Sequence, residues 1–402
     1  MSERDEETVH GPAEGMTVVD VSRALAGPHA GMLLGDLGAR VIKVEAPAGD
    51  DSRGWGPPFV GPEGAQESTY FLSCNRNKES IVLDLKTGDG ASAFSRLVDQ
   101  ADVLIENFRT GVLDRLGFPL AELQARNPRL VVLSITGFGH DGPEAGRSGY
   151  DQIAQGEAGL MSLTGSGPGD YQRVGIPIAD LLAGMNGAYG VLAALLERER
   201  TGRGKVVRTS LLASIVGVHA FQGTRATVAG EVPQPQGNHH PSIAPYGLFR
   251  CGGGAVQISV GSERLWQVFA DRFGLDTSTT TFASNAARLA NRAELTAAIE
   301  RAFAGMEAED LLTVLDEIGV PAGRLRTLDE VYGWAQAASQ HLITGVDHPV
   351  LGTIDLPGSA LRFFDPDGAE TTRLVHSPPP TLDGDGARVR DWLHERVAGV
   401  RR

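Results

Sequence analysis

The stretch TVVDVSRALAGPHAGMLLGDLGARVIKVEAP, residues 17–47, decides the fold. Residues 17–22 form an apolar, β-branched run that is typical of a strand, and residues 26–38 form a short helical pattern ended by glycine. Residues 39–47 follow as a second strand. This succession predicts a β-α-β unit, whose two strands lie parallel in one sheet.

The chain beyond this unit continues the alternation of strands and helices. Short apolar strand patterns occur at 80–86, 101–108, 130–139 and 205–210, with helical patterns at 90–100, 120–127, 184–200 and 211–230. Such alternation is typical of an α/β fold with a parallel sheet flanked by helices. Glu45 ends the second strand about where a ribose-binding acid would lie in a dinucleotide site. The loop SRALAGPHAG lacks the G-x-G-x-x-G spacing, however, which disfavours a nicotinamide enzyme.

The composition of the chain changes near residue 231. The segment EVPQPQGNHHPSIAPYG, residues 231–247, is rich in Pro, Gln, Asn and His and indicates a linker or a loop over a site. Two strand patterns around Gly252–Gly254 then predict a hairpin, and three helical patterns follow it. We therefore expect a smaller α+β domain over residues 231–323. Residues 1–15 are acidic and predict a disordered leader.

Overall composition limits the function classes. The 402 residues are 41% hydrophobic and 21% charged, with a net charge of -14, which argues against a nucleic-acid surface or an anionic membrane as partner. No stretch approaches the roughly 20 apolar residues of a membrane span. The two cysteines, Cys74 and Cys251, cannot form a disulfide framework, and no spacing predicts a metal site. We expect a cytoplasmic protein.

The best candidate for chemistry is Asp180, which interrupts the apolar run IPIADLLAGM just where a helix is predicted to begin. Burying a carboxylate is costly, so its presence needs an explanation. Helix capping is one, because Asp is a favoured N-cap residue. Nucleophilic chemistry is the other, since the helix N-terminus favours the ionised carboxylate. The small neighbours Ala179, Ala183 and Gly184 would leave room for a substrate.

Several colinear motifs resemble those of the family III coenzyme A transferases, the CaiB/BaiF type that includes formyl-CoA and carnitine CoA transferases. They are DVSRALAGPHAGMLLGDLGARVIKVEAP, NRNKESIVLDLK, ENFRTGVLDRLGF, SITGFGHDGP, GYDQIAQGEAGLM, IADLLAGMNGAYGVLAALLERERTGRG and GNHHPSIAPYGLF. The resemblance implies a large Rossmann-like domain built from residues 16–225 and a returning C-terminal part, 328–402, with the smaller domain between them. It also implies two subunits interlocked as a homodimer.

The resemblance further implies a reaction and a nucleophile. Asp180 would attack an acyl-CoA thioester to give an aspartyl anhydride, and CoA thiolate would then form an aspartyl-CoA thioester that passes CoA to a free carboxylic acid. Coenzyme A and acyl-CoA would be substrates, and no tightly bound cofactor is expected. The positions that match CoA contacts of the family are Leu25, Ala26, Leu83, Lys86, Asn107, Phe108, Arg109, Arg115, Thr136, Gly137 and Phe138. Their basic members would meet the phosphates of this polyanion.

An α-methylacyl-CoA racemase on the same fold is the main alternative. That family uses a histidine of a GHD motif, whereas this chain has Tyr150 in GYD, and a tyrosine with an ordinary pKa is a poor proton shuttle at neutral pH. Asp151 matches a transferase acid that orients the site. His140 lies in a loop, and we do not assign it as a base. A non-catalytic acyl-CoA-binding protein is a further alternative, although it would need no nucleophile at Asp180.

The substrate loop of the family corresponds here to GNHHPS. Gly237, Asn238, His239 and His240 would either close over the acyl group or cap a hairpin. The acceptor acid is expected to bind where Tyr150, Asp151 and the loop carrying His239 meet, and no charged residue there matches a recognisable acceptor such as oxalate or carnitine. The resemblance therefore indicates the reaction class but not the acids exchanged.

Overall fold

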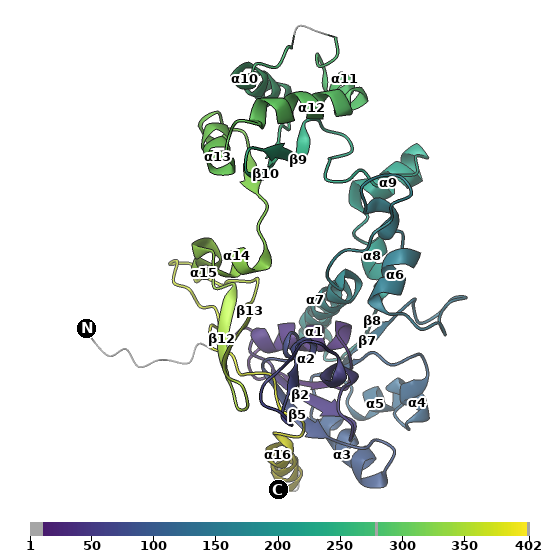
Figure 1. Ribbon diagram of the computed structural model, residues 1–402. Coiled ribbons are helices and arrows are strands. Elements are labelled where there is room, and N and C mark those ends of the chain that lie inside the picture. Colours follow the sequence, from purple (N-terminus) through teal and green to yellow (C-terminus); the bar gives the residue numbers. More distant parts are fainter. Residues whose placement is uncertain (1–10, 278–279, 400–402) are drawn as a thin grey trace, which may run out of the picture. The chain divides into compact units, whose positions relative to one another are not determined.

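The computed structural model describes residues 11–277 and 280–399, which form two compact units (Figure 1). The large unit comprises the chain up to Leu160, Val174–Val228 and the chain from Ala335 onward. The small unit comprises Met161–Arg173 and Ala229–Trp334. The expected boundaries, 16–225, 231–323 and 328–402, differ from this division at 161–173 and at 328–334. Residues 328–334 belong to the small unit and not to the returning part of the large domain, and residues 161–173 likewise belong to the small unit.

The large unit is built on a six-stranded sheet in which every neighbouring pair is parallel. Its strands are β1 (Thr17–Asp20), β2 (Arg40–Glu45), β5 (Lys78–Val82), β6 (Val103–Glu106), β7 (Val131–Thr136) and β8 (Val206–Ser210). The strand order is β5-β2-β1-β6-β7-β8, which confirms the predicted β-α-β unit and parallel sheet. The order reverses direction between β1 and β6. In open α/β sheets, ligands bind outside the carboxyl ends of the strands at such a point.

Alternate side chains of these strands enter two separate cores, one on each face of the sheet. Val18 of β1 packs with α1 (Ala26–Asp36) and α7 (Ile178–Thr201), whereas Val19 packs on the other face with α3 (Gly88–Asp99), α5 (Leu120–Arg126) and α16 (Gly386–Gly399). Both faces are covered, which explains why the strands are apolar at successive positions. Figure 1 shows α1 and α7 on one side of β2 and β5, with α3 and α16 on the other.

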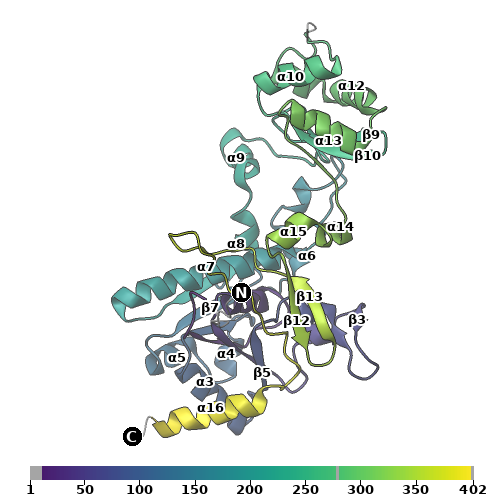
Figure 2. The same cartoon turned by 90° about the vertical axis from the view of Figure 1, so that its left-hand side faces the viewer.

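The remaining elements of the large unit are short. They are η1 (Asp51–Gly54), β3 (Phe59–Val60), β4 (Glu67–Ser68), α2 (Thr69–Leu72), α4 (Val112–Arg115), α6 (Asp151–Glu157), α8 (Leu211–Val216), α9 (Ala220–Ala229), α15 (Ala335–Ser339) and the antiparallel pair β12 (Ile343–His348) and β13 (Gly352–Pro357). Figure 2 shows α16, which returns from this C-terminal part, beside β5. The Asp385 carboxylate at its start accepts the backbone N–H of Ser80 in β5.

The structure corrects two predictions about segments of the large unit. Residues 11–15, expected in a disordered leader, form a turn in which Ala13 is buried and its N–H donates to the Leu37 carbonyl. Residues 1–10 of the leader lie outside the described residues. The single helix predicted for 211–230 is divided into α8 and α9. Ala220 has a φ of 47° at the start of α9, a left-handed conformation that interrupts a right-handed helix.

Helix α7 is long and apolar enough to cross a membrane by length and composition, contrary to the sequence expectation that no such segment exists. Core helices of water-soluble proteins meet the same criteria. One side of α7 lies in the core against the sheet, through the side chains Ala179, Ala183, Val191 and Leu195. The apolar composition of this side is therefore explained by packing within the large unit.

The small unit is an α+β structure. It contains the antiparallel sheet β11 (Ala322–Arg324), β10 (Gly254–Ser259) and β9 (Tyr246–Cys251), and the pairing of β9 with β10 confirms the predicted hairpin. Its helices are η2 (Met161–Leu163), α10 (Glu263–Phe273), α11 (Asn285–Ala290), α12 (Arg292–Phe303), α13 (Ala308–Glu317) and α14 (Leu328–Tyr332). Trp266, Phe269 and Phe303 are fully buried in its own core.

Candidate active site

Asp180 is the third residue of helix α7 and does not cap it. The N-cap position is Pro177, and no side chain makes a capping hydrogen bond there. The capping interpretation of Asp180 is therefore wrong, because an N-cap side chain must precede the helix to reach its free N–H groups. Asp180 is partly buried.

The electrostatic environment of Asp180 differs from the sequence expectation. Burial, followed by the negative charge of Asp151, raises the pKa of Asp180 to about 7. The expectation that the helix N-terminus keeps this group ionised is corrected, because loss of water and a like charge both favour the neutral acid. Asp180 consequently changes charge near neutral pH. A carboxylate with a raised pKa is also more basic and more nucleophilic than an ordinary one.

Asp151 is the first residue of α6 and contacts the start of α7. Its Oδ1 accepts the backbone N–H of Ala179 at 2.8 Å, and its Oδ2 accepts Gln155 Nε2 at 2.7 Å. This carboxylate thus holds the residue next to Asp180, and the orienting role expected of Asp151 stays a prediction. Tyr150 is the N-cap of α6, and its side chain is 68% exposed.

Close packing of α1 against α7 places this helix end above the sheet. A Cβ atom at Gly184, one turn after Asp180, would lie 2.7 Å from the Ala26 carbonyl oxygen and 2.8 Å from His29 Cδ2. Only glycine permits that approach. Burial lowers the pKa of His29 to about 4, and the positive charges of Lys78 and Arg76 act in the same direction. This histidine is therefore neutral at physiological pH.

Tyr70 of α2 is a neighbour of Asp180 that the sequence did not indicate. Burial, followed by the charge of Asp180, raises the pKa of Tyr70 well above its ordinary value, so its hydroxyl keeps its proton. The ring packs edge-on against Trp55 at a centroid distance of 4.8 Å and lies against the cluster of Leu25, Cys74 and Leu181. No local pattern around Tyr70 distinguishes it, because its proximity to Asp180 arises from tertiary folding and not from the sequence around either residue.

A cavity of about 190 Å³ lies at the carboxyl ends of β1, β2, β5 and β6. It is lined by three of the predicted CoA-contact residues, Leu83, Lys86 and Phe108, together with Arg23 and Leu116. The Arg23 guanidinium lies 5.3 Å from the centroid of the Phe108 ring. The lining combines apolar side chains and the cations Arg23 and Lys86 with the carboxylates Glu45, Asp50 and Asp84. A ligand with both apolar and charged parts matches such a mixed lining.

The loops at this sheet edge are joined to one another by polar contacts. Asn107 Nδ2 donates to the Arg23 carbonyl at 2.7 Å, and the Arg23 N–H donates to Asn107 Oδ1 at 2.9 Å. The next residue after Asn107, Phe108, donates its N–H to the buried Glu106 carboxylate at 2.9 Å. Burial raises the pKa of Glu106. These bonds fix the loop after β6 against the loop after β1.

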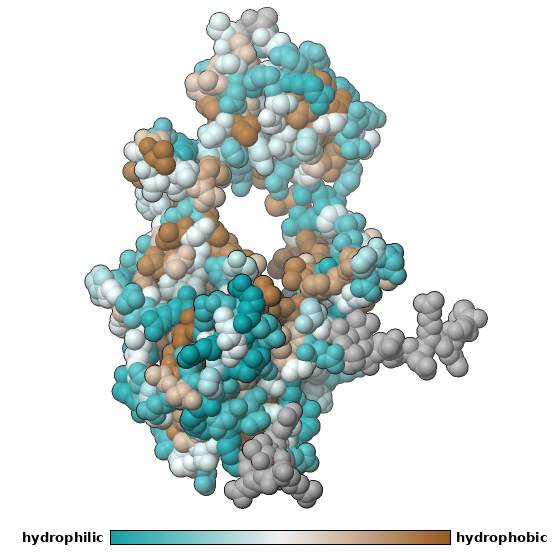
Figure 3. Space-filling model, turned by 180° about the vertical axis from the view of Figure 1, so that it is seen from behind, coloured by the Kyte–Doolittle hydropathy of each residue, from teal (hydrophilic) through white to brown (hydrophobic). Residues whose placement is uncertain are grey.

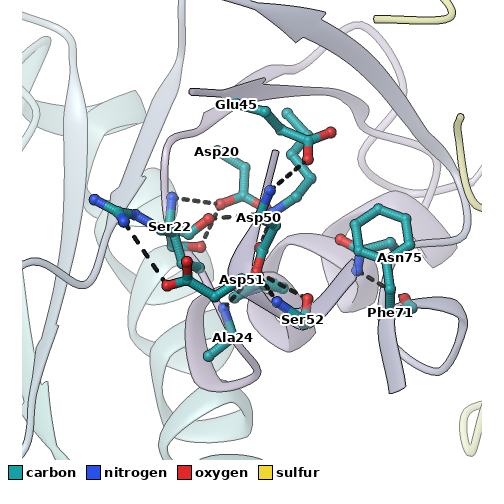
Figure 4. A network of polar contacts seen from close by, with 12 residues as sticks. Asp20, Ser22, Ala24, Glu45, Asp50, Asp51, Ser52, Phe71 and Asn75 are labelled. Carbon is teal, nitrogen blue, oxygen red and sulfur yellow. Dashed lines mark hydrogen bonds and ion pairs between the residues drawn. The ribbon is translucent and has the colours of Figure 1, made fainter. Parts of the chain in front are cut away.

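A buried network of charges lies under the loop after β1 (Figure 4). Lys78 Nζ donates to Asp20 Oδ2 at 2.9 Å, and Lys43 Nζ donates to Asp50 Oδ2 at 2.8 Å, with all four side chains nearly inaccessible. Asp50 Oδ1 also accepts the N–H of Ala24, which has a φ of 66°. A non-glycine residue in this conformation is strained. The network therefore holds the bend that leads to Leu25 and Ala26, two buried residues at the start of α1.

The predicted residues after β7 occupy the same edge. Thr136 Oγ1 accepts the N–H of Gly139, and a Cβ atom at Gly137 would lie 2.7 Å from the backbone of Gly149. The absence of a side chain at Gly137 therefore allows the loop after β7 to pack against the segment just before α6. His140, which the sequence placed only in a loop, has its Nε2 at 2.7 Å from Ser134 Oγ, and Ser134 also bonds Glu106.

The remaining predicted residues belong to the loop and helix that follow β6 or to the small unit. Arg109 and Arg115 are exposed cations on the loop before α4 and at its end. The loop Gly237–His240 belongs to the small unit and packs against β9, where the ring of His240 stacks on Tyr246 at 5.0 Å. His239 lies edge-on to Phe249 at 5.9 Å. These contacts agree with the hairpin-capping alternative; closure over an acyl group stays a prediction.

Comparison with known proteins identifies the family. A family model described as CoA-transferase family III matches residues 14–386. This chain belongs to CoA-transferase family III. It is 36% identical over 380 residues to the succinyl-CoA:glutarate CoA-transferase of Mus musculus, covering 94% of this chain and 85% of that protein. It is 38% identical over 388 residues to the acetyl-CoA:oxalate CoA-transferase of Acetobacter aceti, covering 94% and 95%.

The solved structures agree with this assignment. A crystal structure of a CAIB/BAIF family protein from Brucella suis superposes with a TM-score of 0.84 at 39% sequence identity, covering 96% of this chain and all of that one. The family III chain is thus an enzyme, a CoA-transferase, as the motifs predicted. Its substrates include CoA thioesters. Among residues 11–277 and 280–399, no group of three or more His, Cys, Asp or Glu side chains could hold a metal ion.

Proposed function

We propose that this CoA-transferase works through covalent intermediates on Asp180. The single observation that carries the proposal is the environment of this carboxylate: it is partly buried, it feels the negative charge of Asp151, and its pKa is raised to about 7. At neutral pH a substantial fraction is ionised, and the ionised form retains high basicity. That combination suits a carboxylate that must attack a thioester carbonyl.

In each step of the proposed reaction, one acyl bond breaks as another forms. Asp180 attacks the acyl carbonyl of the donor thioester, the C–S bond breaks, and an aspartyl-acyl anhydride and CoA thiolate result. The thiolate attacks the aspartyl carbonyl and releases the donor acid. The acceptor carboxylate then attacks the aspartyl-CoA thioester, giving a second anhydride and the thiolate. Attack of the thiolate on the acceptor carbonyl forms the new thioester and regenerates Asp180 without ATP.

We propose dicarboxylic acids as the substrate class. The support comes from the relatives, whose names pair succinyl-CoA with glutarate and with mesaconate, and acetyl-CoA with oxalate. CoA itself would bind at the edge formed by the loops after β1, β5 and β6, with Lys86, Arg109 and Arg115 meeting its phosphates. No resident cofactor is required by this chemistry. We also propose that the reaction takes place in the cytoplasm, in keeping with two free cysteines.

We further propose that two copies of the chain form a homodimer. The outer side of α7 carries a stripe of apolar side chains at helical spacing, namely Met185, Tyr189, Leu192 and Leu196, which are 38–74% exposed. Hydrophobic residues reach the surface in the part of Figure 3 that corresponds to α7 and α8. A stripe of this kind on a water-soluble chain favours an interface.

Trapping of the intermediate tests the covalent mechanism. The protein would be incubated with succinyl-CoA or acetyl-CoA and hydroxylamine, which converts an activated carboxylate into a hydroxamate, and then analysed by intact and peptide mass spectrometry. We expect a hydroxamate on Asp180 that is absent from Asp180→Ala. Exchange activity without any trapped carboxylate would contradict the proposal. Entry of solvent deuterium at the α-carbon of the acyl group, without exchange, would instead support the racemase alternative.

A further inference from the structure

The segment that leads into α7 is held by two side chains of one neighbouring helix. Residues 174–179 precede Asp180 and have little regular structure before the helix begins. Asp151 and Gln155, one turn apart on α6, bind this segment at both ends. The Ala179 N–H donates to Asp151 Oδ1 at 2.8 Å, and the Val174 N–H donates to Gln155 Oε1 at 2.9 Å.

The Gln155 amide also contacts the Asp151 side chain and a second point of the 174–179 segment. Its Nε2 donates to Asp151 Oδ2 at 2.7 Å and, in a longer contact of 3.4 Å, to the Ile176 carbonyl. The side chain is fully buried, with 0% exposure. The amide has one orientation only: reversing it would set its oxygen against a carboxylate and its NH₂ group against the Val174 N–H. Gln155 is therefore fully satisfied, and each of its contacts bears on the position of Asp180.

We propose that Gln155 is a positioning residue for the nucleophile: it locks the Asp151 carboxylate and the 174–179 segment into one arrangement, which places Asp180. The proposal rests on the covalent role of Asp180 argued above. A buried amide can hold a carboxylate in place without adding charge. A carboxyl group at the same position would add a negative charge or require a proton, and an apolar side chain would leave Asp151 Oδ2 and the Val174 N–H without these bonds.

Titratable side chains from three helices lie near the start of α7, where Asp180 is located. The titratable side chains packed around the start of α7 are Asp151 on α6, Tyr70 on α2 and His29 on α1. Tyr70 and His29 are neutral at pH 7, as their shifted pKa values require. Asp151 is therefore the charged neighbour through which a change at Gln155 reaches Asp180.

Two variants of Gln155 and a matched control test the proposal. Gln155→Glu preserves size and adds an acid, and Gln155→Met preserves length and removes the hydrogen bonds. Gln152→Glu adds the same acid on the same helix at an exposed position and serves as control. Each variant would be examined by hydrogen exchange of the peptide spanning residues 174–180 and by the pH profile of hydroxamate formation with succinyl-CoA and acetyl-CoA.

We expect faster exchange of the 174–180 peptide in Gln155→Met, because the partners of the Val174 and Ala179 N–H groups are lost or loosened. In Gln155→Glu we expect the pH midpoint of hydroxamate formation to rise, with the rate at pH 7 falling roughly tenfold for each pH unit of the rise. The KM for acyl-CoA should change much less than kcat, since Gln155 does not line the cavity proposed for CoA. Gln152→Glu should match the parent protein in all of these measurements.

The possible failures are distinguishable. An unchanged rate of hydrogen exchange in Gln155→Met would show that the side chain does not hold the 174–179 segment. This result would overturn the proposal whatever the enzymatic activity. If hydrogen exchange became faster but both variants kept the parental kcat and pH profile, Gln155 would have only a structural role, and the proposal would fail. If the parent protein itself forms no hydroxamate on Asp180, the covalent function fails, whereas the exchange experiment still reports on the clamp. A Gln155→Glu variant that does not fold leaves Gln155→Met to decide.

Discussion

The Asp151 carboxylate accepts the backbone N–H of Ala179 at 2.8 Å, so the second acid of the site binds the residue adjacent to Asp180. One carboxylate thereby orients the helix end that carries the other, and its charge contributes to the raised pKa of Asp180. Asp151 thus affects both the position and the pKa of Asp180. This relationship is the basis of the first prediction.

Asp151→Asn should move the pH profile of hydroxamate formation to lower pH. Removing the negative charge lowers the pKa of Asp180 from about 7, so more of the nucleophile is ionised at pH 6. The amide also places an NH₂ group against Gln155 Nε2 or loses the Ala179 N–H, at a cost of about 1–3 kcal/mol in stability. The exposed Asp141→Asn is the control. A midpoint at or above the parental value would contradict the electrostatic role of Asp151.

Asp180→Asn should stabilise the protein at pH 8 and not at pH 4. The folded-state pKa of Asp180, about 7, lies above its ordinary value, so folding penalises the ionised form. The penalty is absent below the unfolded pKa, grows between about pH 4 and pH 7, and is complete above pH 7. We expect roughly 1–3 kcal/mol at pH 8 in urea unfolding. Equal effects at both pH values would show that the carboxyl group does not have a raised pKa.

Asp50→Asn should destabilise the large unit and weaken CoA binding, whereas Asp51→Asn should do neither. Asp50 neutralises the buried Lys43 and holds the strained Ala24, while Asp51 has 65% of its side chain exposed and lies 3.8 Å from Arg23. Breaking a buried ion pair costs about 3–5 kcal/mol. Urea unfolding and calorimetric titration with CoA measure the two effects. Parental behaviour of Asp50→Asn would mean that the network does not support the loop.

Phe108→Ala should weaken the binding of CoA about tenfold, or about 1.4 kcal/mol, because its ring forms part of the wall of the 190 Å³ cavity. The same truncation at Phe364, whose side chain is 54% exposed and outside this cavity, is the control. Isothermal titration with CoA supplies the measurement. Equal affinities for the two variants would place the CoA site elsewhere.

Leu196→Glu should dissociate the proposed dimer. Leu196 is 72% exposed on the apolar stripe of α7, and a buried charge in an interface is costly. Light scattering after gel filtration should give twice the 42.5 kDa chain mass for the parent and one chain mass for the variant. Val375→Glu, at a position that is 79% exposed and not part of α7, should stay dimeric. A monomeric parent protein would refute the homodimer directly.

Much of the fold could be predicted from local patterns. The strands β1, β2, β5, β6, β7 and β8 correspond to apolar runs, because a strand covered on both faces is apolar at successive positions. The hairpin of β9 and β10 followed from glycine between two β patterns. The assignment of residues 161–173 to the small unit could not be predicted, since it depends on contacts with distant segments. The break between α8 and α9 had no proline to mark it.

Periodicity and colinear motifs are properties of the chain, so they were enough to predict the parallel α/β architecture, the family and Asp180 as the candidate nucleophile. The protonation of Asp180 and its neighbours followed only from the folded structure. Asp180 lies three residues into α7, where burial and Asp151 raise its pKa, and Tyr70 and Gln155 reach the site from other elements. Desolvation and charge interactions depend on distances through space, which no local pattern of residues contains.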